Sequence, residues 1–85
     1  MKHAGADALD QLEPLLAELR TLPGLREKSR GIFYRKSQAF LHFHEDPKGL
    51  FGDIRDISGS GFERIDVTGD KGRAELLTAA AMRSS

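Results

Sequence analysis

The chain of 85 residues contains no cysteine. This absence excludes a disulfide scaffold, a thiol nucleophile and a metal site built from thiolates. Because secreted domains of this size often depend on disulfides, an intracellular, cytoplasmic location is expected. The first residues also lack the apolar run of a signal peptide, and no apolar stretch approaches the roughly 18 residues of a membrane span.

The chain also lacks net charge, since 13 basic residues balance 13 acidic ones. That balance argues against a protein that binds nucleic acid mainly by electrostatic attraction. The charge is unevenly distributed, however, because the segment 20–36 contains six basic residues and a single acidic residue, Glu27. A domain that is electrically polar, although neutral overall, is therefore expected.

The hydrophobic pattern predicts one α+β domain that spans residues 1–85. Four leucines at helical spacing predict a helix over about 7–22, ending before Pro23: Leu9, Leu12, Leu16 and Leu19. Runs of strand-forming residues between turn signals predict a four-stranded antiparallel β-meander over about 31–67. The segment 70–83 is predicted to form the C-terminal helix, and residues 25–30 are predicted to be a basic connector.

A tight turn at Asp46–Gly49 would set the register of the two strands beside it. It places His42 opposite Asp53, and the alternation of side chains then divides the sheet into two faces. The predicted core face contains Phe33, Leu41, Phe43, Ile54 and Ile65. The predicted opposite face contains Ile32, Tyr34, Phe40, His42, His44, Phe51, Asp53 and Arg55. For the last strand, a long loop that pairs Arg55 with Asp66 is favoured over a tight turn, which would oppose like charges.

The second face mixes aromatic and charged side chains, and such a surface often marks an interaction site if no helix covers it. The sequence therefore predicts a non-catalytic interaction module whose partner is another protein or a second copy of the chain. A single-stranded nucleic acid is an alternative partner, because arginines beside exposed aromatic rings can stack bases. No membrane partner and no cofactor are predicted. The candidate binding residues are Tyr34, Arg35, Phe40, His42 and Arg55, although these side chains could instead pack against one another or against the first helix.

The segment from His42 to Asp46 supports a different hypothesis, a small metal-binding domain. His42 and His44 are two residues apart on a predicted strand, so both side chains point to the same face. Asp53, opposite His42, could act as a ligand or orient the imidazole. The metal hypothesis therefore names His42, His44 and Asp53. A purely structural His42–Asp53 pair and a general acid–base role are the competing interpretations.

No catalytic residue is assigned from the sequence. The serines lack the sequence context of a nucleophile elbow, and the glycines lie at turn positions rather than at the spacing of a phosphate-binding loop. Without a nucleophile or a cofactor motif, the pattern favours a protein that is not an enzyme.

The run from Gly31 to Asp53, with its Ile-Phe-Tyr-Arg and Phe-Leu-His-Phe-His-Glu-Asp segments, resembles a group of short bacterial proteins of unassigned function. The order of a helix followed by a meander is also loosely similar to YjbR-like domains. The resemblance implies a bacterial cytoplasmic protein. It implies no activity and transfers no catalytic residue to this chain.

Overall fold

A computed structural model describes all 85 residues of the chain. The elements follow in the order β1 (Lys2–His3), α1 (Ala6–Leu19), β2 (Arg26–Ser29), β3 (Ile32–Arg35), β4 (Gln38–Asp46), β5 (Gly49–Arg55), β6 (Phe62–Asp66) and α2 (Asp70–Arg83). The α+β class, with a helix at each end of an antiparallel meander, is confirmed. No helix combines the length and the apolar character that crossing a bilayer requires.

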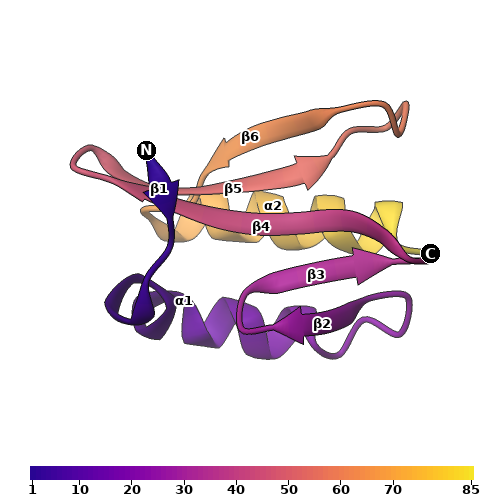
Figure 1. The fold of residues 1–85 in the computed structure, drawn as a ribbon, viewed down its shortest axis with the longest axis horizontal. Helices are drawn as coiled ribbons and strands as arrows, with labels where there is room; N and C mark the ends of the chain where they lie inside the picture. The colour runs from indigo at the N-terminus through magenta and orange to yellow at the C-terminus, as the bar shows by residue number, and fades with distance from the viewer.

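The sheet contains six strands rather than the predicted four. Strands β2 to β6 lie in sequence order, and β1 pairs with the end of β4 that β3 does not reach. Both helices pass behind the sheet in Figure 1, so they cover the same face. The opposite face, which we call the open face, has no helix over it.

The predicted core face is the one that the helices cover. Phe33, Leu41, Phe43 and Ile54 are buried in a single cluster with leucines of α1 and with Leu76 and Ala80 of α2. Ile65 is only partly buried at the edge of this cluster. The predicted pairing of β4 with β5 is also confirmed, with His42 opposite Asp53 and Leu41 opposite Ile54. The turn at Asp46–Gly49 therefore predicted the register of the central hairpin, and alternation identified its inner face.

Phe40 departs from the prediction, because it is buried in the core rather than placed on the open face. In the pairing of β3 with β4, Phe33 lies opposite Leu41 and Tyr34 lies opposite Ala39, so Phe40 is an extra residue without a partner. Such a β-bulge breaks strict alternation and lets two consecutive side chains point to one face. Phe40 and Leu41 consequently both point toward the core.

The register of the last strand also differs from the prediction. Arg55 pairs with Phe62 rather than with Asp66, and Asp53 pairs with Arg64. The neighbouring loop runs over residues 56–61, where the Asp56 carboxylate accepts hydrogen bonds from Ser58 and the Gly59 amide. The longer loop was favoured because it avoids pairs of like charge. The observed register differs from both predicted ones, avoids such pairs as well, and creates the Asp53–Arg64 pair.

The segment predicted to be a basic connector contains the edge strand β2. Its sequence has no alternating apolar pattern. The strand pairs with β3, and ion pairs link the region to α1. The Arg20 side chain donates to Glu27 at 2.6 Å, while Arg30 donates to Asp10 and Glu13 at 2.8 Å each. Two of the arginines near the predicted basic segment are therefore neutralised within the domain.

Candidate metal centre

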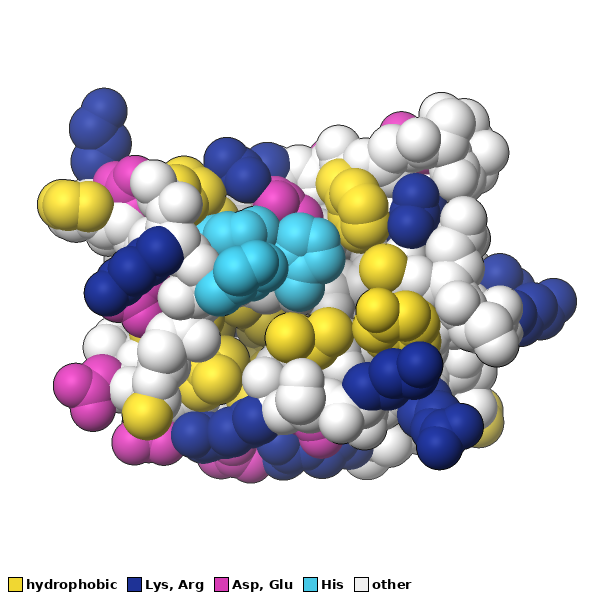
Figure 2. Space-filling model, in the orientation of Figure 1, with side chains coloured by type: hydrophobic (Ala, Val, Ile, Leu, Met, Phe, Trp, Pro, Cys, Tyr) yellow, Lys and Arg dark blue, Asp and Glu magenta, His cyan; other side chains and the backbone are white.

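All three histidines of the chain meet on the open face of the sheet, in the centre of the surface in Figure 2. His42 and His44 are contributed by β4, where a spacing of two residues turns both rings to the same side. His3 is contributed by β1 and lies directly opposite His44 in the antiparallel pairing. The pairing of β1 with β4 is therefore what completes the cluster.

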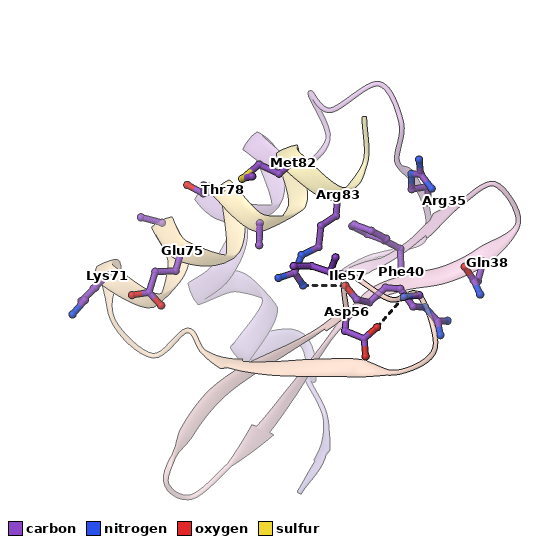
Figure 3. A pocket seen from close by; sticks show the side chains of 14 residues that line it. Arg35, Gln38, Phe40, Asp56, Ile57, Lys71, Glu75, Thr78, Met82 and Arg83 are labelled. Atoms are coloured by element: carbon purple, nitrogen blue, oxygen red, sulfur yellow. Dashed lines mark hydrogen bonds between the residues drawn. The ribbon is translucent and has the colours of Figure 1, made fainter.

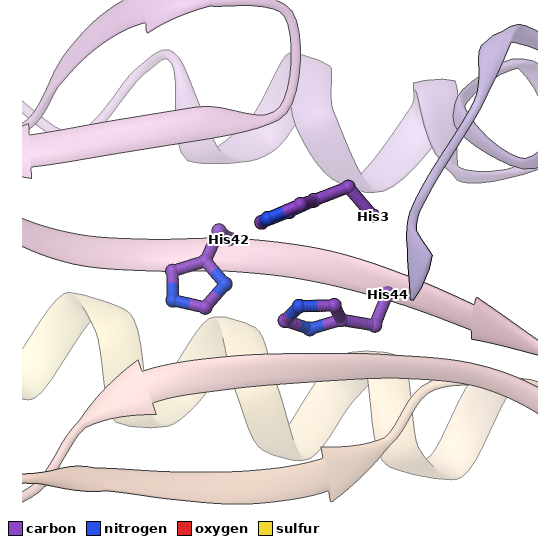
Figure 4. Close-up of side chains that lie close together, drawn as sticks. All are labelled: His3, His42 and His44. Atoms are coloured by element: carbon purple, nitrogen blue, oxygen red, sulfur yellow. The ribbon is translucent and has the colours of Figure 1, made fainter. Parts of the chain in front are cut away.

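The three imidazole rings contact one another, as Figure 4 shows. The His3 and His44 rings are stacked with centroids 4.7 Å apart, and the His42 ring meets His44 edge-on at 5.0 Å. One nitrogen from each ring lies within 4.8 Å of the other two. The cluster thus presents three nitrogen ligands around one point.

His42 and His44 are half-buried, whereas His3 is exposed. The Nδ1 atom of His42 is shielded from solvent and has no hydrogen-bond partner within the chain, whereas the shielded Nδ1 of His44 lies 3.3 Å from Asp53 Oδ2 without hydrogen-bond geometry. A buried polar atom without a partner is costly to a fold and is uncommon in native proteins. A bound ligand would supply the missing interaction.

Asp53 lies beside the cluster, but it is engaged by Arg64. Its two carboxylate oxygens accept hydrogen bonds from Arg64 Nε and Nη2 at 2.7 and 2.8 Å. The hydrogen bonds from Arg64 are the main reason that the pKa of Asp53 is lowered, so the carboxylate stays ionised. Asp53 Oδ2 also lies 3.3 Å from His44 Nδ1, where it can orient the imidazole.

Burial lowers the pKa of both His42 and His44, and its effect outweighs the attraction of the nearby Asp53 carboxylate for an imidazolium. The two rings are therefore neutral at pH 7. A neutral imidazole is the form that binds a metal ion, since protonation occupies the nitrogen that would coordinate it.

We expect the free energy of unfolding to decrease as the pH falls from 7.5 to 5. The lowered pKa values of His42 and His44 mean that the unfolded chain takes up protons first, beginning near an ordinary histidine pKa of about 6.5. Their contribution to stability is complete above that pH and is lost as the pH falls toward the folded pKa values. Urea unfolding at several pH values measures the slope. The double variant His42→Gln/His44→Gln should flatten it, and an unchanged slope would contradict this origin.

Of the predicted metal ligands, His42 and His44 lie in the cluster, and His3 accompanies them as the third imidazole. His3 could not be identified from the sequence pattern, because a two-residue strand is too short to show alternation. Its only signal was that the chain has three histidines in total.

The five predicted binding residues are divided among three places. His42 and Arg55 lie next to Phe62: the His42 ring centroid is 5.0 Å from that of Phe62, and the Arg55 guanidinium lies 4.3 Å over its ring. Arg35 and Phe40 line a cavity beside α2, which Arg55 also reaches. Tyr34 lies elsewhere, beneath the ammonium group of Lys28 at 4.4 Å.

Comparisons with protein-family models, curated proteins and solved structures found no match to this chain.

Proposed function

We propose that this chain is a small metal-binding domain that holds a divalent transition-metal ion through His3, His42 and His44. The observation that carries the proposal is the convergence of three imidazoles from two strands on an open face. The proposal is also supported by the Nδ1 atom of His42, which is buried and has no hydrogen-bond partner within the chain.

The ligand type limits which ions fit. Imidazole nitrogens suit Zn²⁺, Cu²⁺ and Ni²⁺, whereas Mg²⁺ and Ca²⁺ require oxygen ligands. Three nitrogens at ordinary zinc distances would lie about 3.3 Å from one another in a tetrahedral site. The nitrogens here lie within 4.8 Å of one another, so modest ring rotations would bring them together. His3 is exposed and has room for such a rotation.

Three protein ligands leave a fourth coordination position for water or another small ligand. Closed structural zinc sites usually have four protein ligands, while sites with three protein ligands keep one position open. Asp53, first considered as a ligand, is assigned the supporting role of orienting His44, because Arg64 occupies both of its oxygens. Such a carboxylate fixes the ring orientation and increases the basicity of the ligand.

Interaction with another protein, a second copy or a nucleic acid through the open face stays a prediction. The open face is free of helices, and Phe62 is exposed there beside His42. The metal site is favoured because its chemistry depends on a specific arrangement of three residues rather than on exposure alone.

A zinc titration tests the proposed function. We expect Zn²⁺ to shift the imidazole NMR signals of His3, His42 and His44 together, with one ion bound per chain. His42→Ala should weaken binding by about 100-fold, since the loss of one of three ligands removes much of the coordination energy. Calorimetry measures the affinity. The protein used has a few residues added before Met1, so that its terminal amine lies too far from His3 to coordinate the same ion.

Asp7→Asn is the control, because Asp7 is an exposed acidic residue in the first turn of α1 and is not one of the clustered residues. Its zinc affinity should equal that of the unmodified chain. If the His42 and His44 signals do not move, or if the His42→Ala variant binds zinc as tightly as the control, the proposed function is wrong.

A further inference from the structure

A second candidate site lies away from the histidines, in a cavity of about 900 Å³ beside α2. Figure 3 shows it between one side of α2 and the region where β4 begins and β5 ends. None of its lining residues belongs to the histidine cluster. A volume of this size falls within the usual range for small-molecule sites.

The cavity has apolar walls that are exposed to solvent. Phe40, which the β-bulge turns toward the core, contributes the buried part of the lining. Ile57 and Met82 line it as well, although they are 86% and 73% exposed. Leaving two large apolar side chains in water around one hollow is typical of a binding surface.

The charged residues of the lining are mostly basic. Four cationic side chains accompany two carboxylates in the lining: Arg35, Arg55, Lys71 and Arg83 beside Asp56 and Glu75. Arg83 is held by the Arg55 carbonyl at 3.0 Å and by Glu63 at 2.8 Å, while Arg55 donates to the Ala39 carbonyl. These two arginines therefore have structural partners.

Arg35 differs from the other arginines of the cavity. One of its terminal nitrogens donates to the Ser85 carbonyl at 3.0 Å, but its Nε is buried without a hydrogen-bond partner. A guanidinium that retains an unused N–H can donate it to an oxyanion as a charge-assisted hydrogen bond.

We propose that this cavity binds a small amphipathic anion, which places an apolar body against Phe40, Ile57 and Met82 and an oxyanion group at Arg35. The apolar lining accounts for the body of the ligand, and the excess of basic side chains accounts for its charge. A fatty carboxylate is the simplest molecule with both properties. The inference is independent of the metal site, because the two sites share no residue.

Decanoate, used below its micellar concentration, is the probe. We expect decanoate to shift the NMR signals of the Ile57 and Met82 methyl groups in a saturable way. Arg35→Gln should weaken decanoate binding by about tenfold, since it removes a charge-assisted hydrogen bond. Decanol, which has the same chain without the charge, should bind the two proteins equally.

The outcomes separate the alternatives. Equal affinity of decanoate for the unmodified chain and for Arg35→Gln would overturn the assignment of the anion site. Shifts confined to other parts of the molecule would overturn the cavity as the site. If sedimentation shows a dimer and Met82→Glu dissociates it, a second copy of the chain occupies the hollow and the small-ligand proposal fails.

Discussion

Replacing Phe40 with alanine should lower the free energy of unfolding by about 4 kcal/mol, as truncation of a large buried aromatic side chain does. Phe40 is only 4% exposed and belongs to the same buried cluster as Phe33 and Leu41. Alanine would leave a void between α2 and the sheet and would lose most of the side chain's burial. Urea unfolding followed by circular dichroism gives the difference between the two proteins.

Phe62→Ala is the matched control, because Phe62 is 41% exposed on the open face. Its cost should be about 1 kcal/mol, the part that its contacts with His42 and Arg55 contribute. If Phe40→Ala is too unstable to measure, Phe40→Leu should still cost about 1 to 2 kcal/mol. Equal costs at positions 40 and 62 would show that the bulge does not turn Phe40 inward.

Gly72→Ala should destabilise the protein by about 3 kcal/mol, the upper end of the usual cost of overpacking. A loss of stability is unusual for this substitution, since alanine in place of glycine within a helix ordinarily stabilises the helix by roughly 1 kcal/mol. Gly72 lies in the first turn of α2, where a β-carbon would overlap the Asp66 carbonyl oxygen and lie 2.9 Å from its carbon. The Asp66 backbone cannot rotate out of the way as a flexible side chain can, so the start of α2 would have to move away from the end of β6.

Gly69→Ala provides the control for this prediction. Gly69 is the N-cap of the same helix, its φ of −114° suits any residue, and a β-carbon there would meet nothing within 4 Å. Its substitution should cost only about 1 kcal/mol, the preference of an N-cap position for glycine over alanine. Thermal or urea unfolding of the two variants measures the contrast. A stabilising Gly72→Ala would mean that α2 does not approach β6 as closely as described.

Much of the fold could be predicted because local signals agreed with the long-range packing. The Asp46–Gly49 turn determines the pairing of β4 with β5, and alternation then correctly places Phe43 and Ile54 in the core. The leucine spacing likewise identified α1, although the helix ends at Leu19 rather than near residue 22. In each case a pattern within a short segment was sufficient.

The features that were missed depend on interactions between distant segments. Edge strand β2 lies beside ion pairs to α1 and has no hydrophobic pattern of its own. The register of β6 brings Arg64 to Asp53 across the loop at residues 56–61, and turn signals alone could not determine that register. The bulge at Phe40 adds one unpaired residue, which breaks the alternation along β4 and turns Phe40 to the face opposite the predicted one.

In the candidate site, too, the local features were predictable and the features that depend on distant segments were not. His42 and His44 were predictable from their spacing on one strand, whereas His3 joins them only through the pairing of β1 with β4. The pairing of Arg64 with Asp53 depends on the register of β6, which was not predicted, so Asp53 was considered a possible ligand. The structure leaves it instead as the ionised partner of an arginine.

The position of His3 would allow a bound metal ion to cross-link two distant parts of the chain. His3 lies on the short β1, while His42 follows α1, β2 and β3 in the chain. A metal ion joining the two would close a loop of roughly 40 residues, for which chain-entropy estimates predict up to ~4 kcal/mol of stabilisation for a comparable disulfide. In a protein that has no cysteine, the ion would serve as a reversible cross-link, which a chelator or mild acid could open without breaking a covalent bond.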